Sequence, residues 1–114
     1  MKINDDGLFK ICVCLPEEFL KKMMDSINAA MEPVYPGYQR AFSYSRVTGT
    51  WIPLENSNPY KGKTGETEVA DEVRLEFVAK GKDVRNVIKA IVDIHPYEEP
   101  AIDVTSVFNW KEFI

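Results

Sequence analysis

The segment His95-Pro96-Tyr97-Glu98-Glu99-Pro100 decides how the rest of this sequence is interpreted. It follows an apolar helical pattern from Val84 to Ile94 and precedes a β-type alternation from Ala101 to Phe108, which predicts a connection between a helix and a strand. Each proline disfavours helical backbone in the residue before it, so we expect the connection to be stiff. We call residues 95–100 the joint.

The joint places acidic side chains at an unfavourable position. The C-terminal end of a helix carries partial negative charge, which suits His95 but not Glu98 and Glu99. For the two glutamates the alternatives are a solvated turn, a contact with an Arg or N–H group of a neighbouring subunit, or a cation site. For His95 they are a ring that hydrogen-bonds a backbone carbonyl at the helix end, or a metal-binding or acid–base role.

The composition indicates one globular domain. The chain has 114 residues, of which 45% are hydrophobic, enough for one core and too little for two. We expect an N-terminal lead at residues 1–8, a single domain at 9–108, and an aromatic C-terminal tail at 109–114 that docks.

Charge and hydropathy argue against two classes of partner. The net charge of -4 gives no clustered basic surface for nucleic acid or an anionic membrane. The N-terminus lacks an apolar signal core, and no apolar stretch approaches the roughly 20 residues of a membrane span. We therefore expect a cytoplasmic protein with no nucleic-acid or membrane partner.

Apolar periodicity predicts six regular elements separated by turn-forming segments. They are a strand at Phe9–Leu15, a helix from Pro16 to Met31, a strand at Tyr38–Val47, a strand at Val73–Lys80, a helix with Asp83 as its N-cap that ends at Ile94, and a strand at Ala101–Phe108. Between the second and third strands, residues 48–72 are dense in glycine, proline and asparagine, which predicts a long loop, with a short ribbon around Trp51 and Ile52 as the alternative to a fully irregular segment.

The order βαββαβ predicts a ferredoxin-like α+β fold, with both helices on one face of an antiparallel sheet. The opposite face combines apolar and charged side chains, which is typical of an oligomer contact. These side chains are Lys10, Cys12, Cys14, Arg74, Glu76, Val78, Asp103, Thr105 and Val107.

The two cysteines lie two residues apart in the first predicted strand. Their side chains point the same way without the geometry of a bridge, so a disulfide within the chain is excluded. We expect Cys12 and Cys14 to be small core or interface hydrophobes, with soft-metal binding as the alternative.

Several motifs together resemble one family, the PII-like or CutA-like module of YqfO-type (Nif-three-like) proteins, in its free-standing form. The motifs are Leu15-Pro16-Glu17-Glu18, Gly49-Thr50-Trp51-Ile52-Pro53-Leu54, Asn58-Pro59-Tyr60-Lys61-Gly62, Glu72-Val73-Arg74-Leu75-Glu76 and, above all, the joint with Ala101. The resemblance covers nearly the whole chain, from Phe9 to about Val107.

The resemblance implies a non-enzymatic binding or regulatory module that assembles with itself as a homotrimer and needs no cofactor. A protein or small-molecule ligand would then meet the long loop, by analogy with the mobile loop of PII signalling proteins. The candidate loop residues are Thr48, Gly49, Thr50, Trp51, Pro53, Asn58, Pro59 and Gly62. The glycine spacing of this loop does not match a phosphate-binding loop. The alternative to a ligand or partner loop is a structured connection that is packed by its own side chains.

The alternative function is divalent metal binding in the style of CutA proteins. Its weak candidate ligands are His95, Glu98, Glu99, Cys12 and Cys14. A closed transition-metal site needs about four nitrogen, sulfur or oxygen ligands, and the chain has one histidine. We therefore expect no tightly bound metal.

Overall fold

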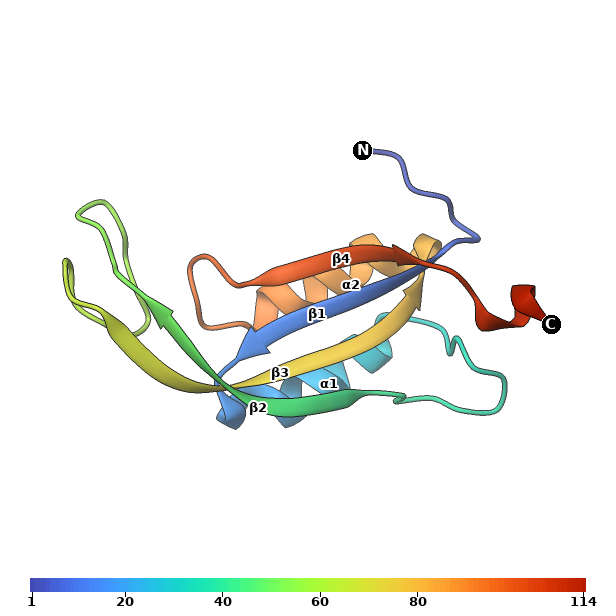
Figure 1. The fold of residues 1–114 in the computed structure, drawn as a ribbon, viewed down its shortest axis with the longest axis horizontal. Coiled ribbons are helices and arrows are strands. Elements are labelled where there is room, and N and C mark those ends of the chain that lie inside the picture. The colour runs from blue at the N-terminus through green and yellow to red at the C-terminus, as the bar shows by residue number, and fades with distance from the viewer.

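A four-stranded antiparallel sheet carries two helices on one face (Figure 1). The computed structural model describes residues 1–114. The elements in chain order are β1 (Leu8–Leu15), the 3-10 turn η1 (Glu17–Phe19), α1 (Leu20–Ala29), β2 (Ser43–Trp51), β3 (Glu68–Lys80), α2 (Gly81–Ile94), β4 (Ile102–Val107) and the 3-10 turn η2 (Trp110–Phe113). The strand order is β2-β3-β1-β4, so the ferredoxin-like plan is confirmed.

The core lies between the helices and the two central strands. Alternate residues of β1, Phe9 to Leu15, are buried and face buried residues of β3 and of both helices. Antiparallel pairing of Ile11 with Phe77 and of Val13 with Leu75 sets this register. The residues between them, Lys10, Cys12 and Cys14, therefore point to the face without helices, as the alternation predicts.

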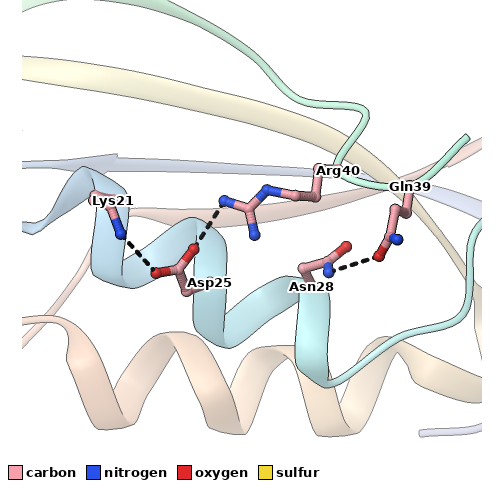
Figure 2. A network of polar contacts seen from close by, with 5 residues as sticks. All are labelled: Lys21, Asp25, Asn28, Gln39 and Arg40. Atoms are coloured by element: carbon pink, nitrogen blue, oxygen red, sulfur yellow. Dashed lines mark hydrogen bonds and ion pairs between the residues drawn. The ribbon is translucent and has the colours of Figure 1, made fainter.

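The second strand begins later than the sequence pattern predicts. The pattern placed it at residues 38–47, but β2 begins at Ser43 and extends to Trp51. Figure 2 shows the reason: Arg40 contacts Asp25 of α1 at 2.9 Å, and Asn28 of α1 donates to Gln39 at 3.1 Å. Arg40 also has a positive φ of 57°. These contacts hold the chain against α1 instead of the sheet.

The third strand begins earlier than expected, and this shortens the predicted loop. β3 begins at Glu68, and its first five residues pair only with residues 47–51 of β2, because β1 pairs with β3 only from Val73 onward. The paired residues 47–51 and 68–72 form a two-stranded extension, which we call the arm. The arm extends beyond the rest of the sheet (Figure 1), and the true loop is residues 52–67.

The N-terminus of α2 is capped by main chain and not by Asp83, so that N-cap prediction is wrong. The helix begins at Gly81, whose N–H donates to Gly7 O at 2.8 Å, and Lys82 N–H donates to Asp5 O at 3.2 Å. Asp83 instead accepts from Glu32 N–H at 3.0 Å. The N-terminal residues therefore satisfy the free N–H groups of the helix.

The C-terminal tail is not buried by the rest of its own chain. Phe108, Trp110, Phe113 and Ile114 are all exposed, although Phe108 and Phe113 make an edge-to-face contact with centroids 6.0 Å apart. Neither helix is long and apolar enough to cross a membrane.

Replacement of Gly81 should test the packing of the N-terminal residues. A Cβ at this position would overlap the main-chain oxygen of Asn4 and press on the ring of Phe9. Gly81→Ala should therefore lower the free energy of unfolding by about 1–3 kcal/mol. The exposed Lys89→Ala on the same helix serves as the control and should change it by less than about 0.5 kcal/mol. Equal stability of the two variants in urea denaturation would contradict this packing.

Candidate functional site

His95 fixes the joint to the end of the first strand. Its N–H donates to Ile91 O at 2.9 Å, and its ring Nε2 lies 2.7 Å from Cys14 O. Tyr97 N–H donates to Nδ1 of the same ring at 3.2 Å. Because Nδ1 accepts this hydrogen bond, Nε2 carries the proton and donates to Cys14 O. The prediction of a helix-end histidine bonded to a backbone carbonyl is confirmed.

The histidine ring is neutral and fully used. The residue is only 7% exposed, and burial lowers its pKa below the ordinary value. The neighbouring Cys14 carbonyl and the Glu72 carboxylate oppose this shift. With both ring nitrogens in hydrogen bonds to main chain, His95 has no free lone pair for a metal or for a proton in catalysis.

Tyr97 connects the joint to the arm. Its hydroxyl donates to Glu72 Oε2 at 2.7 Å, and Glu72 is only 7% exposed. Burial raises the pKa of Tyr97, and the hydrogen bond to Glu72 raises it further, so the hydroxyl remains a donor. The joint and the arm therefore share one buried polar contact.

Gly49 makes room for this carboxylate. A Cβ at position 49 would overlap Glu72 Oε1, so only glycine leaves space for the side chain. The sequence pattern placed Gly49 in a loop, whereas it lies inside β2 and pairs with Ala70. The same correction applies to Thr48 and Thr50, which also belong to β2. Trp51, where the sequence left a short ribbon open, is the last residue of β2.

The loop after the arm folds back on the joint. Asn58 N–H donates to Glu98 Oε1 at 3.0 Å. A backbone N–H of the same chain therefore binds one of the two acidic side chains of the joint. The Trp51 indole N–H donates to Lys61 O at 3.1 Å. The rings of Trp51 and Tyr60 lie 5.4 Å and 5.8 Å from that of Tyr97, centroid to centroid.

Arm, loop and joint enclose a cleft of about 570 Å³. The residues that line it are Cys14, Gly49, Thr50, Trp51, Ile52, Pro53, Leu54, Asn56, Ser57, Pro59, Tyr60, Lys61, Glu72, Tyr97, Glu98, Glu99 and Ala101. The volume lies in the range of small-molecule sites, which is roughly 300–1,000 Å³.

The cleft brings together most of the candidate residues. Of the candidate loop residues Gly49, Thr50, Trp51, Pro53 and Pro59 line it, and of the joint Tyr97, Glu98 and Glu99 do. The candidates outside its lining are Thr48, Asn58, Gly62, His95, Pro96 and Pro100. Six lining residues lay in recognised motifs but were not candidates for the site: Ile52, Leu54, Tyr60, Lys61, Glu72 and Ala101. Only the strand register, which sets Gly49 near Glu72, could have identified the buried carboxylate.

The weak metal candidates form no metal-binding cluster, although Cys14, Glu98 and Glu99 line the same cleft. Cys12 Sγ accepts from Arg74 Nε at 3.2 Å on the open face of the sheet. Burial raises the pKa of the Cys14 thiol, and the neighbouring Cys12 adds to this, so Cys14 is a thiol near neutral pH. No group of three or more His, Cys, Asp or Glu residues is placed to hold a metal ion.

Comparison with curated proteins finds relatives much longer than this chain. The chain is 30% identical over 110 residues to a Staphylococcus epidermidis protein named GTP cyclohydrolase 1 type 2 homolog, a match that covers 96% of this chain and 30% of the relative. The Bacillus subtilis protein of the same name is 33% identical over 99 residues, which is 87% of this chain and 26% of that protein. The chain thus spans under a third of these relatives. No family model matches the chain.

Comparison with solved structures finds three that share the fold of this chain. A Bacillus cereus protein related to NIF3 superposes with a TM-score of 0.79 at 29% identity, over 96% of this chain and 28% of that one. CutA1 from Shewanella sp. SIB1 superposes with a TM-score of 0.68 at 13% identity, over 97% and 94% of the two chains. Bacillus subtilis GlnK in complex with ATP gives 0.64 at 13% identity, over 92% and 85%. The last two likenesses concern the fold alone.

The buried histidine should make stability depend on pH. Its pKa is lower in the folded than in the unfolded chain, so the unfolded chain takes up the proton first as pH falls below about 6.5. The free energy of unfolding should therefore decrease from pH 7.5 to 5.5, with a slope of at most about 1.4 kcal/mol per pH unit. His95 is the single histidine, so His95→Gln should flatten this slope. Equal slopes in both proteins, measured by denaturant unfolding, would contradict the neutral buried ring.

Proposed function

Because the chain matches the PII/CutA-like module of the YqfO (Nif-three-like) family, we propose that it is a homo-oligomeric binding or regulatory module and not an enzyme. The observation that carries this proposal is the cleft between arm, loop and joint. Two of its walls, formed by residues 49–54 and by residues 97–99, come from segments far apart in the sequence. A ligand in the cleft would contact both and would stabilise the arm against the joint.

The chemistry of the cleft supports binding over catalysis. Its cysteine is a thiol, because burial raises the pKa of Cys14, and the nearest histidine uses both ring nitrogens in hydrogen bonds. Tyr97 also stays protonated. A nucleophile needs an adjacent base that can accept its proton, and none of these groups provides that pairing.

The arm supports self-association. A two-stranded ribbon is marginally stable alone in water. The arm and the loop next to it nevertheless leave Ile52, Leu54 and Val69 exposed. β2 is an edge strand that pairs only with β3, and most of its residues are exposed. A second copy that covers this surface would remove the open edge and bury the apolar side chains. We propose a homotrimer, the assembly that the family resemblance implies.

Divalent cation binding is the second candidate function. One observation favours it: Glu98 and Glu99 line the same cleft as Glu72, although the three carboxylates are not grouped around one point. Elemental analysis of the dialysed native protein separates the two candidates. Close to one metal ion per chain would favour the cation site and oppose the organic-ligand module.

A charge placed on the arm should disrupt the assembly. Val69 is 60% exposed in the isolated chain, and its burial against a neighbour would contribute on the order of 1.5 kcal/mol. Val69→Lys removes that term and places a charge in the interface, so the concentration needed for assembly should rise by roughly tenfold or more. Sedimentation equilibrium at tens of micromolar measures this, with a trimer expected for the unmodified chain.

The matched control is Val92→Lys on α2. Val92 is 53% exposed, so the chemical change and the initial exposure are similar, but the residue lies far from the arm in sequence and on the helical layer. This variant should assemble like the unmodified chain. A monomer for the unmodified chain would contradict the oligomer, and equal dissociation of both variants would contradict the arm as the contact.

A further inference from the structure

We propose that the cleft between arm, loop and joint binds a small organic cation, an amine or guanidine attached to an apolar or aromatic body. This inference rests on the proposed binding function and specifies the chemistry of the ligand. Three features of the cleft carry it: its uncompensated negative charge, the state of the Glu72 carboxylate, and its aromatic walls.

Lys61, which lines the cleft, and Arg46, which lies near Glu72, are both paired within the chain. Lys61 lies 4.0 Å from Glu68, and Arg46 makes two hydrogen bonds to Glu17, at 2.7 Å and 3.0 Å. The carboxylates that line the cleft, Glu72, Glu98 and Glu99, make no ion pair, although Glu98 accepts a hydrogen bond from Asn58 N–H. The cleft therefore presents negative potential to a ligand, which favours a cation and opposes a phosphate.

Glu72 is the carboxylate with the greatest need of a partner. It is only 7% exposed, and its one hydrogen bond, from Tyr97, goes to Oε2. Oε1 accepts no hydrogen bond from the chain and fills the space that a Cβ at position 49 would take. It is still reached by solvent, because no buried side-chain nitrogen or oxygen atom lacks a partner. Buried carboxylates are costly unless they are paired and hydrogen-bonded. An ammonium or guanidinium N–H group is the donor that suits this oxygen best.

The aromatic walls suit the same ligand. Trp51, Tyr60 and Tyr97 all line the cleft. The rings of Trp51 and Tyr60 each lie within 6 Å of the Tyr97 ring, centroid to centroid. Aromatic faces attract cations through the ring quadrupole, and tryptophan does so most strongly. The Trp51 N–H is already bonded to Lys61 O, so this residue offers its ring and not a donor. Pro53 and Leu54 add apolar surface for the body of the ligand.

Tryptophan fluorescence provides the test. The full-length chain with Trp110→Phe keeps Trp51 as its single tryptophan, which lies in the wall of the cleft. The probes are phenethylamine, agmatine, the neutral analogue 2-phenylethanol, and ATP with magnesium. Phenethylamine and agmatine should shift the emission with dissociation constants below about 1 mM, whereas 2-phenylethanol should bind roughly tenfold or more weakly.

Three variants locate the cation. Glu72→Gln keeps an acceptor for the Tyr97 hydroxyl but removes the charge, and should weaken phenethylamine binding roughly tenfold to a hundredfold. Glu99→Gln, at an exposed position that the fold does not need, should weaken it several-fold, so the test survives if Glu72→Gln is unstable. Glu112→Gln makes the same chemical change in η2 at the other end of the molecule (Figure 1) and should leave binding unchanged.

The outcomes separate this inference from the function on which it rests. Binding of ATP in preference to both amines would overturn the cation inference and leave the binding module standing. Equal binding of phenethylamine and 2-phenylethanol, or amine binding unchanged in both Glu72→Gln and Glu99→Gln, would overturn it in the same way. A Trp51 emission that responds to none of the four probes at 10 mM would count against both the cation and the binding module, at the limit of roughly millimolar affinity that this assay can detect.

Discussion

The hydrogen bond from the Tyr97 hydroxyl to Glu72 is the contact on which the arrangement of the cleft depends. It joins the connection after α2 to the part of β3 that extends beyond β1. Without it, the arm would be a two-stranded ribbon that is anchored at one end and borders solvent on both faces. With it, arm and joint become two walls of one site.

This contact continues into the main sheet through a chain of polar groups. Glu72 accepts from the Tyr97 hydroxyl, Tyr97 N–H donates to His95, and the other nitrogen of that ring donates to Cys14 O at the end of β1. No buried side-chain nitrogen or oxygen atom lacks a partner. Glu72 Oε1, which accepts no hydrogen bond within the chain, is therefore still reached by solvent, and Glu72 lines the cleft. A ligand in the cleft could bind this oxygen.

Much of the fold followed from local pattern, and the exceptions have physical causes. The alternation in β1 and the 3.6-residue period of α2 reflect burial on one face, so their positions could be predicted. The start of β2 could not, because residues 39 and 40 bind α1 through side-chain contacts across the fold. Gly49 signalled a turn by composition, whereas its role in the strand is to make room for a carboxylate on the neighbouring strand. The N-cap prediction failed because carbonyls from the chain start, distant in sequence, cap α2.

The candidate site was predictable only in part, because contacts between distant segments bring its walls together. The joint and the loop were recognised separately as motifs, but their meeting depends on aromatic and hydrogen-bond contacts that span about 40 residues of sequence, such as Asn58 with Glu98.

The most direct measurement of the link between joint and arm is hydrogen exchange of the arm amides, residues 47–51 and 68–72, in Tyr97→Phe. Loss of the hydroxyl leaves Glu72 buried without its donor, so protection of these amides should fall roughly tenfold or more, while the amides of β1 stay unchanged. Tyr44→Phe, which removes an exposed hydroxyl with no hydrogen bond within the chain, is the control. Arm protection that is the same in both variants would contradict the account.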